Sequence, residues 1–140
     1  MIKYILGAKG AGKTKWLIDH ANDDLNSGNG NIVFVEVDDD HIFSLDHNVR
    51  LVNATEFNLE NVDTFYGFFC GLMAMDYDLE KIYVDGIYKV LDLTLDDLEY
   101  LHNKLEKLDT QDKEIYINVD YLTEDLPDQL KQYGEEVVEG

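Results

Sequence analysis

The alternation of apolar and polar positions predicts strands and helices that follow one another along the chain. Short runs rich in β-branched and aromatic residues predict strands at 3–6, 32–37, 81–86 and 114–119, with a weaker strand at 50–52. Apolar residues at helical spacing predict helices over 14–25 and 62–75, a helix that follows a capping box at 94–97, and a short helix between Pro127 and Gly134.

This order of elements predicts an α/β fold, a three-layer sandwich with a mostly parallel sheet and helices on both faces. Because the chain has 140 residues, we expect one domain over 1–134, followed by a loose tail over 135–140. The segment 62–75 is apolar nearly all round its helix. Such a helix is either buried on more than one side or pairs with another chain.

The composition of the chain excludes several kinds of partner and compartment. The net charge of −19 argues against nucleic-acid partners and acidic membrane surfaces, because both attract lysine and arginine. The only cysteine, Cys70, lies in an apolar run and has no intramolecular disulfide partner, which is typical of a reducing compartment. The opening residues are too short for a secretory signal core, and no apolar stretch is long enough to cross a bilayer. We therefore predict a cytoplasmic protein.

The positive charges are unevenly placed. The first 15 residues contain four lysines and no acid, although the whole chain is strongly acidic. A basic end on an acidic protein indicates a place for an anion.

A glycine loop lies within that basic end. The residues from Gly7 to Thr14 match the pattern G-x-x-x-x-G-K-[ST] in full, between a predicted strand and a predicted helix. Its glycines allow successive backbone N–H groups to point at phosphate oxygens, and the helix adds the positive end of its dipole. Lys13 is expected on the β and γ phosphates and Thr14 on Mg²⁺. The predicted nucleotide-binding residues are Gly7, Ala8, Lys9, Gly10, Ala11, Gly12, Lys13, Thr14 and Lys15.

The loop, together with Asp85 at the end of a later hydrophobic strand, resembles the Walker A and Walker B pair of P-loop NTPases. Residues 1–14 and 65–68 also resemble short stand-alone bacterial P-loop proteins of unestablished activity. The resemblance implies a minimal P-loop nucleotide-binding domain, with ATP as the first candidate ligand and GTP as the second; the sequence shows no recognisable reader of either base. It also implies catalytic roles for Lys13 and Asp85, and a Mg²⁺ ion held by Thr14 and Asp85. Alternatively, Asp85 and Gly86 form a strand-ending turn.

The group that would activate water is not evident. Many P-loop ATPases have a glutamate directly after the aspartate, whereas this chain has Gly86, and the GTPase motifs D-x-x-G after the strand and N-K-x-D are absent. Glu36 or the acidic run 38–40 is a candidate from the neighbouring strand end, although acidic runs are usually solvated. Asn118 and Asp120 either sense the γ-phosphate or close a strand. The single arginine, Arg50, is more typical of a surface charge.

Three functions follow from these features. The first is a slow NTPase or a nucleotide-dependent switch that acts with a protein partner or a second copy, because the loop is complete but the catalytic set is poor. The second is a small phosphotransferase for a nucleoside or metabolite, which needs no water-activating glutamate but usually has a basic lid. The third is a non-enzymatic interaction module with a vestigial loop.

Overall fold

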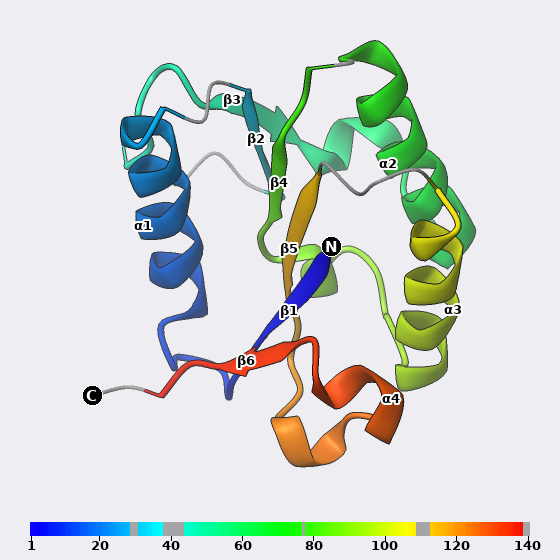
Figure 1. Cartoon of the computed structure of the whole chain (residues 1–140). Helices are drawn as coiled ribbons and strands as arrows, with labels where there is room; N and C mark the ends of the chain where they lie inside the picture. Colours follow the sequence, from blue (N-terminus) through cyan, green and yellow to red (C-terminus); the bar gives the residue numbers. More distant parts are fainter. Residues whose placement is uncertain (29–30, 38–43, 77, 109–112, 139–140) are drawn as a thin grey trace.

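The central layer of the protein is a parallel sheet with the strand order β3-β2-β4-β5-β1-β6 (Figure 1). The computed structural model describes residues 1–28, 31–37, 44–76, 78–108 and 113–138. The strands are β1 (Ile2–Leu6), β2 (Ile32–Glu36), β3 (Arg50–Asn53), β4 (Lys81–Val84), β5 (Glu114–Asn118) and β6 (Gly134–Glu136).

Helices cover both faces of this sheet. In Figure 1, α1 lies against one face, and α2 and α3 lie against the other. The three-layer α/β architecture predicted from the sequence is therefore confirmed. The helices are α1 (Lys13–Asn26), α2 (Val62–Met75), α3 (Leu95–Glu106) and α4 (Asp128–Lys131), with short 3₁₀ helices η1 (Ala54–Phe57), η2 (Ile87–Lys89) and η3 (Thr123–Asp125).

The core has two parts because successive side chains of a strand point to opposite faces. On the face covered by α1, the strand residues Ile5, Phe34 and Tyr83 pack with Leu17 and Ala21 of the helix. On the other face, strand residues pack against α2 and α3, including three buried leucines of α3. The residues of this larger part include Tyr4, Leu6, Val33, Val35, Ile82, Val84, Ile115, Ile117, Phe65, Phe69, Leu98, Leu101 and Leu105.

Helices α2 and α3 begin at reciprocal caps. Thr94 accepts a hydrogen bond from the Asp97 backbone N–H, and the Asp97 side chain accepts one from the Thr94 N–H, as the sequence predicted. Helix α2 begins with the same arrangement at Asn61. Within this chain, α2 is not buried on more than one side: Phe65 and Phe69 face the core, whereas Gly67, Gly71 and Met75 are exposed. Its other predicted role, pairing with another chain, stays a prediction.

The C-terminal segment differs from the sequence expectation. The tail predicted to be loose from Glu135 instead contains β6, which pairs in parallel with β1 from Tyr4 to Leu6. A Cβ at Gly134 would lie 2.6 Å from Leu6 Cδ1, so a larger residue here would force the Leu6 side chain to shift. Glu135 and Glu136 have little intrinsic tendency to form a strand, so the sequence did not predict one here; their strand forms by pairing with the edge of β1. Residues 139–140 lie outside the described residues.

The strand order determines which loops meet. Strand β5 lies between β1 and β4, so the carboxyl ends of β1, β5, β4 and β2 are neighbours along one edge. Ligands of parallel α/β sheets bind beyond such an edge. In the part of the chain that the structure describes, no helix combines the length and apolar character needed to cross a bilayer.

Candidate functional site

The glycine loop connects the carboxyl end of β1 to the first turn of α1. Gly12 precedes the helix with a φ of 98°, and Gly7 has a φ of 149° with its α-carbon facing the backbone of Val137. A side chain is strained at both positions. In the described part of the chain, no side chain caps the start of α1. The N-terminal end of the helix is therefore open to an external acceptor.

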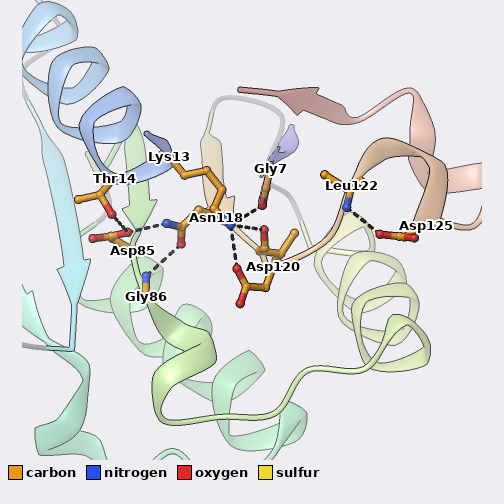
Figure 2. A network of polar contacts seen from close by, with 10 residues as sticks. Gly7, Lys13, Thr14, Asp85, Gly86, Asn118, Asp120, Leu122 and Asp125 are labelled. Carbon is orange, nitrogen blue, oxygen red and sulfur yellow. Dashed lines mark hydrogen bonds and ion pairs between the residues drawn. The ribbon is translucent and has the colours of Figure 1, made fainter. Parts of the chain in front are cut away.

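The Lys13 side chain turns back over the loop and is 4% exposed. Its ammonium donates hydrogen bonds to the Gly7 carbonyl at 2.7 Å, the Val119 carbonyl at 3.0 Å and the Asp120 carboxylate at 2.9 Å (Figure 2). It also lies 5.6 Å from the centre of the Tyr88 ring. An ammonium has three protons to donate, so these three acceptors use its full capacity. The buried charge is therefore compensated within the chain itself.

A second set of contacts joins the loop to β4 and β5. The Thr14 hydroxyl donates to Asp85 Oδ1 at 2.9 Å. The Asn118 amide donates to the same oxygen, and its own oxygen accepts from the Gly86 N–H at 3.0 Å. Asp85 and Asn118 are 6% and 0% exposed. Because both ends of the Asn118 amide are engaged, it holds the Asp85 carboxylate toward Thr14 (Figure 2).

The oxygens of Thr14 and Asp85 have a spacing that suits a small hard cation. Adjacent ligands of an octahedral Mg²⁺ at 2.0–2.1 Å are about 2.9 Å apart, which matches the observed separation of 2.9 Å. Among the described residues, no group of three or more His, Cys, Asp or Glu side chains forms a metal site. An ion between Thr14 and Asp85 would therefore share its coordination with water or phosphate oxygens, as Mg²⁺ usually does.

Glu36 ends the strand next to Asp85. Val35 pairs with Val84 in the parallel register, and the Asp85 N–H donates to the Val35 carbonyl at 2.8 Å. Glu36 is only 1% exposed, so its carboxyl group is buried at the carboxyl edge of the sheet. The other acidic candidates, 38–40, lie outside the described residues.

Two predicted or considered cations do not join the Lys13 cluster. Lys15, on the exposed surface of α1, forms an ion pair with Asp19 at 2.5 Å. Arg50 begins the edge strand β3 and lies 3.9 Å from Asp76. Its side chain is 57% exposed, as expected of a surface charge.

The remaining loop residues border a hollow of about 340 Å³. Ala8, Lys9, Gly10 and Ala11 form one side of it, together with Gly7. The other side is formed by Leu122, by the end of β6 and by the two valines that follow β6. The Val137 N–H donates a hydrogen bond to the Leu6 carbonyl at 2.8 Å, which holds this segment beside β1. The C-terminal segment was not predicted to take part in the site. The valines at 137 and 138 were the available sequence signal.

The surroundings of Lys13 are strongly acidic. Burial, followed by the charges of Asp120 and Asp85, raises the pKa of Tyr88, so its phenol stays neutral at ordinary pH. Asp120 was a candidate γ-phosphate sensor in the sequence, whereas Tyr88 was not among the predicted site residues. A tyrosine three residues after the strand-ending Asp85 is a local signal, but its contact with Lys13 depends on the fold.

Comparison with known proteins adds no assignment. No protein-family model and no curated protein matches this sequence. The interpretation of the site therefore depends on the glycine-loop pattern and on the geometry described above.

Proposed function

We propose that this chain is a P-loop protein that binds a nucleoside triphosphate with Mg²⁺ and acts as a nucleotide-dependent switch or slow NTPase. The observation that carries the proposal is the Thr14–Asp85 contact. It joins α1, the helix that follows the glycine loop, to the carboxylate directly after β4, a strand that lies two positions from β1 in the sheet. A metal-bound triphosphate needs both groups at this place.

The phosphates would lie against the loop backbone and the uncapped start of α1. Lys13 is already close to the loop, but all three of its protons are engaged. To bind the β and γ phosphates, its ammonium must release some of its present acceptors. Asp120, whose side chain is 45% exposed, is the partner that can turn into solvent. The exchange of carboxylate for phosphate would link nucleotide binding to the loop after β5.

Thr14 and Asp85 would hold Mg²⁺, directly or through water. Bound there, the ion would neutralise charge on the β and γ phosphates. Asn118 would keep the Asp85 carboxylate oriented, because its amide is fixed between Asp85 and Gly86. The rest of the nucleotide has room in the hollow between the loop and the C-terminal segment.

Slow turnover is supported by the residues around Asp85. The residue that follows it is Gly86, which has no side chain to activate water. Glu36 ends the strand β2, which neighbours β4, and it would orient the attacking water from there. Among the residues that the structure describes, the site has one buried candidate base and no arginine beside the glycine loop. Such a site is typical of a switch whose catalytic arginine is supplied by a partner.

The test is a titration of the full chain with ATP and GTP, with and without Mg²⁺. We expect Mg²⁺-dependent binding, with ATP preferred. Lys13→Ala should weaken binding about 100-fold, because it removes charged hydrogen bonds to phosphate. Lys107→Ala is the matched control, since it removes the same charge from an exposed position at the end of α3. Equal losses in the two variants, or no binding by the wild type, would contradict the proposal.

A phosphotransferase is the second candidate, because a separate hollow of about 220 Å³ adjoins the Lys13 partners and offers space for an acceptor. Phosphate release should be followed with and without small hydroxyl and amine compounds. Turnover that requires such a compound favours the phosphotransferase, whereas binding with little turnover favours the switch. No binding at all leaves the interaction module with a vestigial loop.

A further inference from the structure

The hollow beside Lys13 lies beyond the carboxyl ends of β4 and β5. It has a volume of about 220 Å³. Tyr88 and Tyr121 supply aromatic walls, Leu93 and Val119 supply apolar ones, and Asp92 and Asp120 supply carboxylates. Among the described residues, no lysine or arginine lines it. Its lining therefore combines a flat aromatic surface with negative charge, which is the chemistry that recognises organic cations.

Part of this lining already holds an ammonium group, that of Lys13. Val119 and Asp120, which line the hollow, accept two of the three hydrogen bonds from the Lys13 ammonium, and the ring of Tyr88 lies 5.6 Å from it. A carbonyl, a carboxylate and an aromatic ring around one nitrogen form a receptor for a cation. In this structure the chain supplies that cation itself.

A triphosphate would change the occupancy of this receptor. When the Lys13 ammonium turns to the β and γ phosphates, the Val119 carbonyl, the Asp120 carboxylate and the Tyr88 ring lose their cation. We propose that the hollow then binds the ammonium or guanidinium group of a small organic cation, which replaces Lys13 on these acceptors. This inference rests on the proposed nucleotide binding and names a second ligand for the same site.

The charges around the hollow favour a cation over an anion. Burial raises the pKa of Tyr121, and the nearby carboxylates of Asp92, Asp97, Asp125 and Asp120 raise it further. The phenol is therefore neutral, and the acids around it produce a negative potential. Asp92 is exposed and lines this hollow, whereas the glycine loop lines the other one, so Asp92 can attract a cation without being part of the nucleotide site.

The two ligands would be linked thermodynamically. A cation that needs the acceptors of Lys13 binds the free protein poorly, because Lys13 occupies them. The nucleotide removes that competitor, and by reciprocity the cation favours the nucleotide-bound form. We expect the affinity for the cation to rise about ten-fold or more when nucleotide is bound, which is typical of coupled sites.

The experiment is calorimetric titration of the full chain with n-butylguanidinium, alone and with saturating Mg²⁺ and a non-hydrolysable ATP analogue. n-Butylurea, which has the same shape and no charge, is the neutral control. We expect butylguanidinium to bind about ten-fold tighter with the nucleotide, and butylurea to show no such gain. Equal cation affinity in both states, no cation binding in either state, or equal binding of butylurea would overturn the inference.

A pair of variants locates the effect. Asp92→Asn should weaken butylguanidinium binding several-fold in the nucleotide-bound state. Asp96→Asn, which removes an equal charge from an exposed position in the first turn of α3, should leave it unchanged. Equal losses in the two variants would reduce the effect to net charge and contradict the assigned site. Nucleotide affinity, measured first, separates the two proposals: without nucleotide binding both fail, whereas nucleotide binding without cation coupling refutes this one alone.

Discussion

Each edge of the sheet holds a lysine among acidic groups, and the two differ in how their partners are fixed. At the amino edge, Lys81 begins β4 and binds Asp24 at 3.1 Å and Glu114 at 3.0 Å. The Tyr83 hydroxyl donates to Asp24, and the Tyr116 hydroxyl donates to Glu114. Every partner belongs to a helix or a strand, so this cluster ties α1, β4 and β5 together.

At the carboxyl edge, the partners of Lys13 are two backbone carbonyls and the half-exposed carboxylate of Asp120. Asp120 follows β5 in a loop, and its side chain has solvent to turn into. The same ammonium–carboxylate chemistry is therefore structural at one edge and exchangeable at the other. The comparison predicts that changes at the carboxyl edge alter ligand binding and turnover, whereas changes at the amino edge alter stability.

The largest expected effect concerns turnover. Glu36→Gln should lower the rate of nucleotide hydrolysis about 100-fold, because it removes the proposed group that orients water. Nucleotide affinity should stay close to that of the wild type. Glu114→Gln, a carboxylate at the opposite edge, is the control and should leave the rate unchanged. Steady-state phosphate release measures both, and an unchanged rate in Glu36→Gln would remove Glu36 from the mechanism.

The next effect concerns stability. Lys81→Met should lower the free energy of unfolding by about 2 kcal/mol, because it leaves Asp24 and Glu114 close together without their cation. Denaturant unfolding followed by circular dichroism measures this. Nucleotide affinity should not change, since Lys81 lies at the far edge of the sheet. A large loss of nucleotide binding in a folded Lys81→Met protein would break the division between the two edges.

A gain in affinity is expected at the carboxyl edge. Asp120→Asn should tighten nucleotide binding about five-fold, because the neutral amide competes less well for Lys13 and no longer repels phosphate. Asp96→Asn serves as the charge control in the same titration. Weaker binding in Asp120→Asn would show that Asp120 supports the nucleotide rather than competing with it.

Much of the fold could be predicted because its signals are local. The β-branched runs gave the strands at 32–36, 81–84 and 114–118, and the cap at Thr94 placed the start of α3. Strand β6 could not be predicted, since Glu135 and Glu136 form a strand only against the edge that β1 offers. Its local sequence has no β-forming tendency that would replace this partner.

The site divides in the same way. The glycine loop and the strand-ending Asp85 were visible as patterns, and the parallel order of elements predicted that they lie at one edge. The hydrogen bond between Lys13 and Asp120 joins residues 107 positions apart, and no sequence spacing indicates it. The contact of Lys13 with the Tyr88 ring depends on the path of the chain after β4. These long-range contacts carry the proposals about exchange and cation binding.

The smallest expected effect is the pH dependence of the stability that Glu114 contributes at the amino edge of the sheet. Burial raises the pKa of Glu114. The hydrogen bonds from Lys81 and Tyr116 and the charges of Lys81 and the amino terminus lower this pKa, and together they outweigh burial, so the net shift is downward. A carboxyl whose pKa is lower in the folded state stabilises the protein above its unfolded pKa of about 4.3. That contribution is lost as the pH falls through the folded value.

The variant Glu114→Gln should therefore be less stable than the wild type at pH 7 by less than about 1 kcal/mol, because the side chain is 36% exposed and its ion pair is screened by solvent. The difference should shrink as the pH falls below the unfolded pKa and vanish once the wild-type carboxyl is protonated in both states. Denaturant unfolding of both proteins across this range measures the difference, with the exposed Glu56→Gln as the control for net charge. A difference that grows toward low pH would mean that Glu114 is stabilised in its protonated form, and that Lys81 holds Asp24 alone.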